Sequence, residues 1–284
     1  MPRPHRARVD RPDPAVRPYV PVRAGGQGPV AMSAAMSSAP SEAAQLWLRG
    51  LDSRRQTARY RLFVFPHAGA GASSYQLAEH FPDSVEVCSV QLPGRENRFV
   101  EPPLLSVEAV VDELAPLISG RSELPFGFFG HSMGALLAFA LANRLRNTGA
   151  PLPTRLFLSA LRAPHLPDRE PLHHLSDADL LARLRRSEFV GLDPELQELL
   201  LPTVRADLTV CETYEHRHQA PLPCPFTVLG GDRDDSVREP ELAAWRAHTS
   251  AEFELRMFPG DHLYVRGAEQ QLVESIARTL PVRR

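Results

Sequence analysis

The stretch Gly130-His131-Ser132-Met133-Gly134 lies between a strand-like run at 126–129 and a helix-like run over 133–147. Small residues at both ends of the stretch allow a strand and a helix to pass closely, and the turn between them forces a strained backbone on the central serine. Ser132 then stands at a helix N-terminus, where backbone N–H groups favour a developing negative charge. This context predicts a nucleophile elbow; a glycine-rich turn with a capping serine is the alternative.

Short apolar runs and longer helical patterns alternate from residue 60 onward. The short runs predict strands at 61–65, 85–90, 126–129, 155–159, 226–229 and 253–258. Helical spacing predicts helices near 74–80, 107–119, 133–147, 240–249 and 268–280. Such alternation predicts an α/β fold with a mostly parallel central sheet and helices on both faces, which binds ligands beyond the carboxyl ends of the strands. A chain of 284 residues that is 43% apolar suits one such domain.

Residues 164 to about 218 interrupt this alternation and contain no good strand pattern. Two helical patterns, 176–186 and 194 to about 214, replace it. We expect this insertion to form a helical lid over the carboxyl edge of the sheet. Its leucine-rich face could line an acyl-binding cleft, although ordinary packing onto the core is the expected use of most of these leucines.

A serine needs a base within hydrogen-bond reach, and a third group must orient that base. In the α/β-hydrolase fold these residues follow in the order Ser, acid, His. His262 lies in a glycine turn after the run at 253–258, near the C-terminus and downstream of a candidate acid. We therefore expect His262, among eleven histidines, to be the base.

Three carboxylates, Asp232, Asp234 and Asp235, lie in the glycine turn after the run at 226–229. The pattern Gly231-x-x-Asp234-x-x-Val237 matches the usual acid turn of this fold. Asp234 is therefore the preferred acid, with Asp235 as the main alternative and a solvated turn carboxylate as the expectation for the others.

The first strand-like run leads into Pro66-His67-Ala68-Gly69, a loop of mostly small residues that permits close backbone approach. In this fold, the loop after that strand donates one N–H group to the oxyanion hole, and the residue after the nucleophile donates the other. We expect Ala68 and Met133 to be these donors. His131 is too close in sequence to serve as the base for Ser132, so we interpret it as a support of the turn.

Composition argues against several other classes. A net charge of −2 with no basic cluster argues against a nucleic-acid or membrane-surface partner. The three cysteines show no spacing suited to a disulfide framework or a zinc site, and no cofactor or metal is expected.

Residues 1–40 are rich in Pro, Arg, Gly, Ser and Ala, which predicts a disordered tail or an over-long gene start; a short interaction tail is the other interpretation. Residues 41–284 are then the folded domain, expected in the cytoplasm because no signal or membrane-span pattern is found.

Five segments together resemble the type II thioesterases of polyketide and nonribosomal peptide synthesis. They are Phe65-Pro66-His67-Ala68-Gly69, Gln91-Leu92-Pro93-Gly94-Arg95-Glu96, the elbow, Leu229-Gly230-Gly231-Asp232-Arg233-Asp234 and Phe258-Pro259-Gly260-Asp261-His262, with Trp245 matching a family tryptophan. The resemblance implies an enzyme that hydrolyses stalled or wrongly loaded acyl groups from the phosphopantetheine arm of carrier domains, with Ser132, Asp234 and His262 as its triad. Two departures are Ala70 and Asp261, where the family commonly has glycine; the carboxylate of Asp261 could shift the titration of the neighbouring base.

Two rivals remain open from the sequence. A carboxylesterase on the same scaffold would use the same serine chemistry without a carrier partner. A non-catalytic hydrolase-fold protein would only bind a ligand or a carrier, and an intact triad argues against it because binding needs none of the three residues. For the thioesterase we expect a monomer whose partner is an acyl or peptidyl carrier domain.

Overall fold

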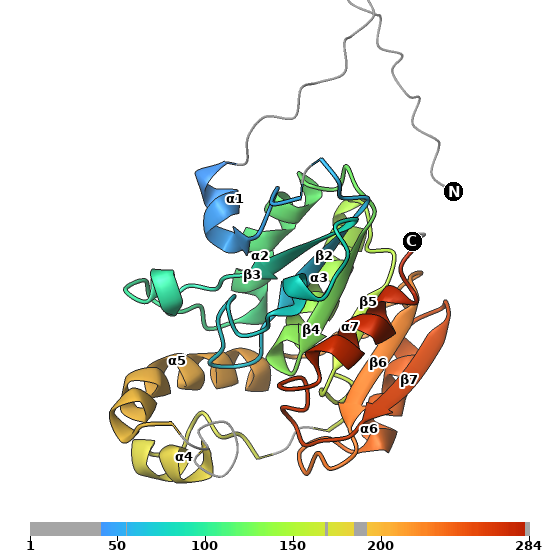
Figure 1. The fold of residues 1–284 in the computed structure, drawn as a ribbon. Helices are drawn as coiled ribbons and strands as arrows, with labels where there is room; N and C mark the ends of the chain where they lie inside the picture. Colours follow the sequence, from blue (N-terminus) through green and yellow to red (C-terminus); the bar gives the residue numbers. More distant parts are fainter. Residues whose placement is uncertain (1–40, 55, 168–169, 185–191, 282–284) are drawn as a thin grey trace, which may run out of the picture. The chain divides into compact units, whose positions relative to one another are not determined.

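The computed structural model describes residues 41–54, 56–167, 170–184 and 192–281, and the predicted tail at 1–40 lies outside them. Within these ranges seven strands form one sheet in the order β1-β3-β2-β4-β5-β6-β7 (Figure 1). The strands are β1 (Leu48–Arg49), β2 (Tyr60–Phe65), β3 (Val85–Val90), β4 (Phe126–His131), β5 (Leu156–Ser159), β6 (Phe226–Gly231) and β7 (Phe253–Phe258). β1 pairs antiparallel with β3, and every other pair is parallel. The predicted, mostly parallel sheet is therefore confirmed.

Helices occupy most of the predicted segments. The α-helices of the described ranges are α1 (Glu42–Trp47), α2 (Val107–Ser119), α3 (Met133–Thr148), α4 (Asp177–Leu184), α5 (Pro194–Glu212), α6 (Glu239–Ala243) and α7 (Glu269–Ala277). Three 3₁₀ helices join them: η1 (Leu77–Glu79), η2 (Glu96–Arg98) and η3 (Ala244–His248). None of the helices described is long and apolar enough to span a membrane.

One predicted helix, at 74–80, is wrong in extent because only the turn η1 forms there. The Ser74 hydroxyl accepts a hydrogen bond from the Gly71 N–H at 3.1 Å. Serine side chains that bond nearby backbone groups compete with helix formation, so the segment before η1 turns instead. The predicted helix at 240–249 is likewise divided into α6 and η3.

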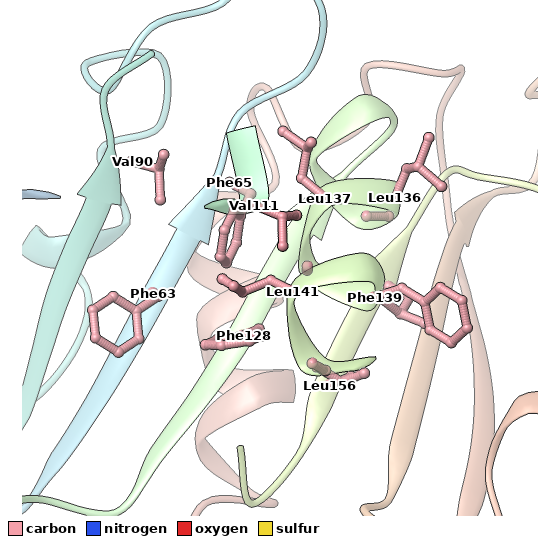
Figure 2. Packing of buried hydrophobic residues seen from close by; sticks show 14 of the residues in the cluster. Phe63, Phe65, Val90, Val111, Phe128, Leu136, Leu137, Phe139, Leu141 and Leu156 are labelled. Atoms are coloured by element: carbon pink, nitrogen blue, oxygen red, sulfur yellow. The ribbon is translucent and has the colours of Figure 1, made fainter. Parts of the chain in front are cut away.

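Two apolar layers cover the two faces of the sheet. Along β2, Phe63 and Phe65 belong to the layer with α2, α3 and η3, whereas Leu62 and Val64 belong to the layer with η1 and α7. This alternation follows from the two-residue period of a strand. Figure 2 shows Phe63, Phe65 and Phe128 packed beside the α3 leucines in the first layer. Strands β4 and β6 are thus buried along their whole length, whereas β7 at the end of the sheet is partly exposed.

The predicted insertion between β5 and β6 contains α4 and α5, as the two helical patterns indicate. Residues 168–169 and 185–191 of this segment lie outside the described ranges, including part of the helix predicted at 176–186. Leucines of α4 and α5 form a separate apolar cluster, in which Leu180, Leu184 and Leu201 are buried. The expectation that most of these leucines pack onto the core is therefore wrong, because they pack against one another in a cluster of their own.

Candidate active site

Ser132 lies in the turn between β4 and α3 and has a φ of 52°, a region that side-chain-bearing residues seldom adopt. A Cβ atom on Gly134 would lie 2.0 Å from the carbonyl oxygen of Phe65, and one on Gly130 would lie 2.1 Å from the carbonyl oxygen of Gly134. Only glycine fits at either position. The Ser132 N–H donates to the Ser159 carbonyl at 2.8 Å, which anchors the strained residue to β5. The geometry is that of a nucleophile elbow.

The structure brings Ser132, His262 and Asp234 together. The Nε2 atom of His262 lies 3.1 Å from the Ser132 Oγ, and its Nδ1 atom lies 2.8 Å from the Asp234 Oδ2. Ser132 follows β4, Asp234 follows β6 and His262 follows β7, so the parallel strands place all three at the carboxyl edge of the sheet. A carboxylate accepts at Nδ1 only if that nitrogen carries the proton, which leaves Nε2 free to accept from the serine hydroxyl. This is the tautomer that a general base needs.

The neighbouring carboxylates occupy different positions. Asp234 is buried, with 8% of its surface exposed, whereas Asp232 and Asp235 are exposed. Asp232 Oδ1 accepts from the Gly260 N–H at 2.9 Å and thereby ties the acid turn to the histidine turn. The structure thus places the preferred carboxylate, rather than Asp235, against His262.

Asp234 is fixed by a residue that the sequence analysis did not single out. The Ser236 hydroxyl and N–H donate to Asp234 Oδ1 at 2.5 and 2.8 Å, and the Ser236 Oγ also lies 2.8 Å from His262 Nδ1. Burial opposes ionisation of Asp234, but the hydrogen bonds from His262 and Ser236 outweigh it and lower the pKa of the carboxyl below its ordinary value. The sequence signal that could have identified Ser236 is a hydroxyl residue two positions after the candidate acid.

The two expected oxyanion donors leave adjacent strands. Phe65 at the end of β2 is in register with Gly130 of β4, so the loop containing Ala68 and the start of α3 lie beyond the same edge of the sheet. Met133 is the first residue of α3, and the N–H groups of a first helical turn have no partner within the helix. Ala68 lines the same cavity as His262.

Buried polar side chains form a layer behind the triad. His131 Nδ1 lies 2.8 Å from the Ser159 Oγ, and that oxygen lies 2.6 Å from the Tyr264 hydroxyl, so His131 supports the elbow as expected. The His67 ring contacts the Tyr75 hydroxyl at Nδ1 and accepts from Arg266 at Nε2. Burial, reinforced by the Arg266 charge, lowers the pKa of His67 from 6.5 to about 3. Tyr75 and Tyr264 of this group were not predicted; Tyr75 lies eight positions after His67, but Tyr264 is 105 positions from Ser159.

A cavity of about 430 Å³ opens beside His262. Its apolar wall comes largely from the insertion between β5 and β6, and its charged residues come from the acid and histidine turns and from Arg183 of α4. The apolar side chains that line it are Leu172, Leu184, Val204, Leu208 and Leu263. Asp261, the unusual carboxylate beside the base, also lines it and accepts from the Leu263 N–H at 2.9 Å. The cavity therefore offers an apolar surface beside His262.

A parallel sheet of this order, with a serine elbow and a histidine held by an aspartate, defines a serine hydrolase of the α/β-hydrolase fold. The comparisons with known proteins narrow the class. The family model "Thioesterase domain" matches residues 60–282, and the chain belongs to this family of thioester hydrolases.

Three similar proteins illustrate the family. Gramicidin S biosynthesis protein GrsT of Aneurinibacillus migulanus is 40% identical over 229 residues, covering 78% of this chain and 90% of that protein. Thioesterase PikA5 of Streptomyces venezuelae is 39% identical over 245 residues, covering 84% and 87% respectively. The structure of the type II thioesterase BorB from the borrelidin biosynthetic cluster has a TM-score of 0.73 and 36% identity, covering 82% of this chain and 95% of that one.

Proposed function

We propose that this chain is a type II, editing thioesterase that hydrolyses aberrant or stalled acyl groups from the phosphopantetheine arms of carrier domains. The observation that carries the proposal is the hydrogen-bonded series Ser132–His262–Asp234 beside a cavity with an apolar wall. The names of the relatives support the biosynthetic setting, since GrsT belongs to gramicidin S biosynthesis and BorB to the borrelidin cluster.

The proposed reaction has two acyl-transfer steps. In the first, His262 Nε2 takes the proton of the Ser132 hydroxyl while the oxygen attacks the thioester carbonyl, and the N–H groups of Ala68 and Met133 stabilise the oxyanion. The carbon–sulfur bond breaks, and the pantetheine sulfur leaves as a thiol with the proton from His262. In the second step a water molecule, deprotonated by His262, attacks the Ser132 ester, and the acid is released as the serine hydroxyl is restored.

Asp234 supports both steps without taking a proton. Its negative charge stabilises the imidazolium that forms when His262 holds the serine proton, and its hydrogen bond keeps the ring in the required tautomer. The lowered pKa of Asp234 means that this carboxylate stays ionised at neutral pH.

We also propose that the enzyme acts as a cytoplasmic monomer on a carrier-domain partner. One chain supplies all three side chains of the site, so the chemistry requires no second copy. Its three cysteines, Cys88, Cys211 and Cys224, are free thiols, which suits a reducing compartment.

A comparison of three substrates with one acyl group tests the proposal. They are the acyl group on a carrier domain, on free pantetheine and as an oxygen ester. We expect the highest kcat/KM for the carrier-bound thioester and the lowest for the oxygen ester. A preference for the oxygen ester would instead favour a carboxylesterase, and failure of a fluorophosphonate probe to label Ser132 would favour a non-catalytic binding protein.

A further inference from the structure

A buried ion pair, Arg95 with Asp207, lies outside the triad. The two terminal guanidinium nitrogens of Arg95 donate to the two carboxylate oxygens of Asp207 at 2.7 Å each, which is the bidentate geometry of a strong pair. Arg95 is 3% exposed and Asp207 is 1% exposed. Arg95 comes from the loop after β3, whereas Asp207 comes from α5 of the insertion.

Both members of the pair also hold the loop that carries Ala68. The Gly69 N–H donates to Asp207 Oδ2 at 2.6 Å, and Arg95 donates to the Ala70 carbonyl at 3.1 Å. The Gly69 N–H belongs to the peptide group directly after Ala68, and the Ala70 carbonyl lies two residues beyond Ala68. Any shift of the pair therefore moves the backbone of the proposed oxyanion donor.

Helix α5 makes further contacts with the same loops. Gly69 has a φ of 78°, and a Cβ there would lie 2.7 Å from the Val204 Cγ2, so α5 packs directly on this glycine. The Thr203 hydroxyl donates to the Gly94 carbonyl at 2.8 Å, beside Arg95. The side chains of Thr203, Val204 and Asp207 thus hold one face of α5 against the loops that follow β2 and β3.

We propose that Arg95 and Asp207 are positioning residues that couple the seating of α5 to the placement of the Ala68 N–H in the oxyanion hole. Stability alone explains the pair poorly, because well-packed apolar residues often replace a buried ion pair without loss of stability. What apolar residues could not replace is the acceptor for the Gly69 N–H and the donor to the Ala70 carbonyl. The proposal rests on the function proposed above.

The chain offers a matched control pair at the opposite edge of the sheet. Arg61 Nε lies 2.6 Å from Glu86 Oε2, and their side chains are 2% and 0% exposed. These residues lie near the amino ends of β2 and β3, whereas the site lies at the carboxyl edge. We therefore expect loss of this pair to lower stability without moving the N–H groups of the oxyanion hole.

The test compares the double variants Arg95→Met/Asp207→Leu and Arg61→Met/Glu86→Leu. For each, kcat and KM on an acyl-pantetheine thioester, the melting temperature, and affinity for an acyl trifluoromethyl ketone are measured, because this ketone forms a tetrahedral adduct with the nucleophilic serine. We expect the first variant to fold, to lose about 100-fold in kcat at unchanged KM, and to lose ketone affinity by a similar factor, since misplacement near 1 Å has such an effect. The control variant keeps the wild-type kcat and ketone affinity.

Wild-type kcat and ketone affinity in a folded Arg95→Met/Asp207→Leu variant would overturn the proposal and leave the pair a purely structural role. If that variant does not fold, Asp207→Asn, which has nearly the same shape, decides the question well below its melting temperature. A lowered kcat at unchanged KM supports positioning, and an unchanged kcat with a lowered melting temperature rejects it. Absence of thioester turnover in the wild type would instead reject the proposed function itself.

Discussion

Ser132 combines backbone strain with a nearby base. Its positive φ is tolerated because Gly130 and Gly134 leave room for the turn and because its N–H is bonded to β5. Strained residues of this kind cost about 1–3 kcal/mol and persist where the surrounding structure holds them. The result is a half-buried hydroxyl that lies 3.1 Å from His262 Nε2.

Asp234 is buried and bonded to His262 whereas Asp235 is exposed, so amide substitution can separate the proposed role of each. Asp234→Asn is expected to lower kcat by about 10⁴-fold, because the amide favours the wrong tautomer of the histidine. Asp235→Asn is the matched control and should leave kcat near the wild-type value, since Asp235 is exposed and the hydrogen bond to His262 comes from Asp234. Initial rates of thioester hydrolysis measure both, and equal losses in the two variants would contradict the assignment.

His67 makes the fold sensitive to acid. Its pKa is about 3 in the folded chain against an ordinary value of 6.5, so between these pH values the unfolded chain binds the extra proton. The free energy of unfolding therefore falls as the pH falls below 6.5, by about 1.4 kcal/mol per pH unit from this group.

Urea unfolding across this pH range tests the effect. The variant His67→Gln removes the titration and is expected to reduce the pH slope by about that amount. The exposed His80 provides the control, His80→Gln, which should unfold with the wild-type slope. Parallel slopes for His67→Gln and the wild type would show that His67 does not bind the proton on unfolding.

At the scale of elements, the close approach of the start of α3 to the end of β2 fixes the position of Ser132. Gly134 contributes no side chain there, and any Cβ would meet the Phe65 carbonyl. The same loop after β2 is held from the other side by α5 through Asp207 and Val204. The site is thus confined between a helix that belongs to the sheet layers and a helix of the insertion.

Two glycine-to-alanine variants separate close packing from backbone strain. Gly134→Ala is expected to lower the free energy of unfolding by about 3 kcal/mol or more, because it forces α3 away from β2. Gly149→Ala, at the end of α3, should lower it by about 1–2 kcal/mol, because Gly149 has a φ of 69° but no atom within 4 Å of a built Cβ. Chemical denaturation gives both values, and a smaller loss for Gly134→Ala would contradict the close approach.

The elements with strong periodic patterns were predicted well, and the weak ones were not. The pattern at 107–119 coincides with α2, whereas α1 and β1 are too short, at 6 and 2 residues, for any period to appear. The order of the three site turns was readable because each follows a strand in a parallel sheet. Arg95 and Asp207 are 112 positions apart, so no local pattern could pair them.

At the scale of the whole molecule, two findings support the proposed chemistry. One is the family match over residues 60–282, and the other is the triad at the carboxyl edge of the sheet. The residues of the site come from segments that begin at residue 65 and end near residue 264. The domain proposed for residues 41–284 therefore contains every group that the mechanism uses.

Deletion of residues 1–40 tests this domain assignment. We expect the shortened chain to keep the wild-type melting temperature and kcat on an acyl-pantetheine thioester, because the tail shows no apolar period and supplies no group to the mechanism. The shortened and full chains should also share the same KM for an acyl-carrier substrate. A raised KM for the carrier substrate alone would identify the tail as an interaction segment.

The most direct measurement is the rate at which Ser132→Ala hydrolyses an acyl group from a carrier domain. The variant should fold like the wild type, since alanine removes only the hydroxyl. We predict a loss of at least about 10⁴-fold in kcat and no acyl adduct in the mass of the quenched enzyme, whereas the wild type acquires an adduct on Ser132. Hydrolysis by the folded variant at the wild-type rate would contradict a serine thioesterase mechanism.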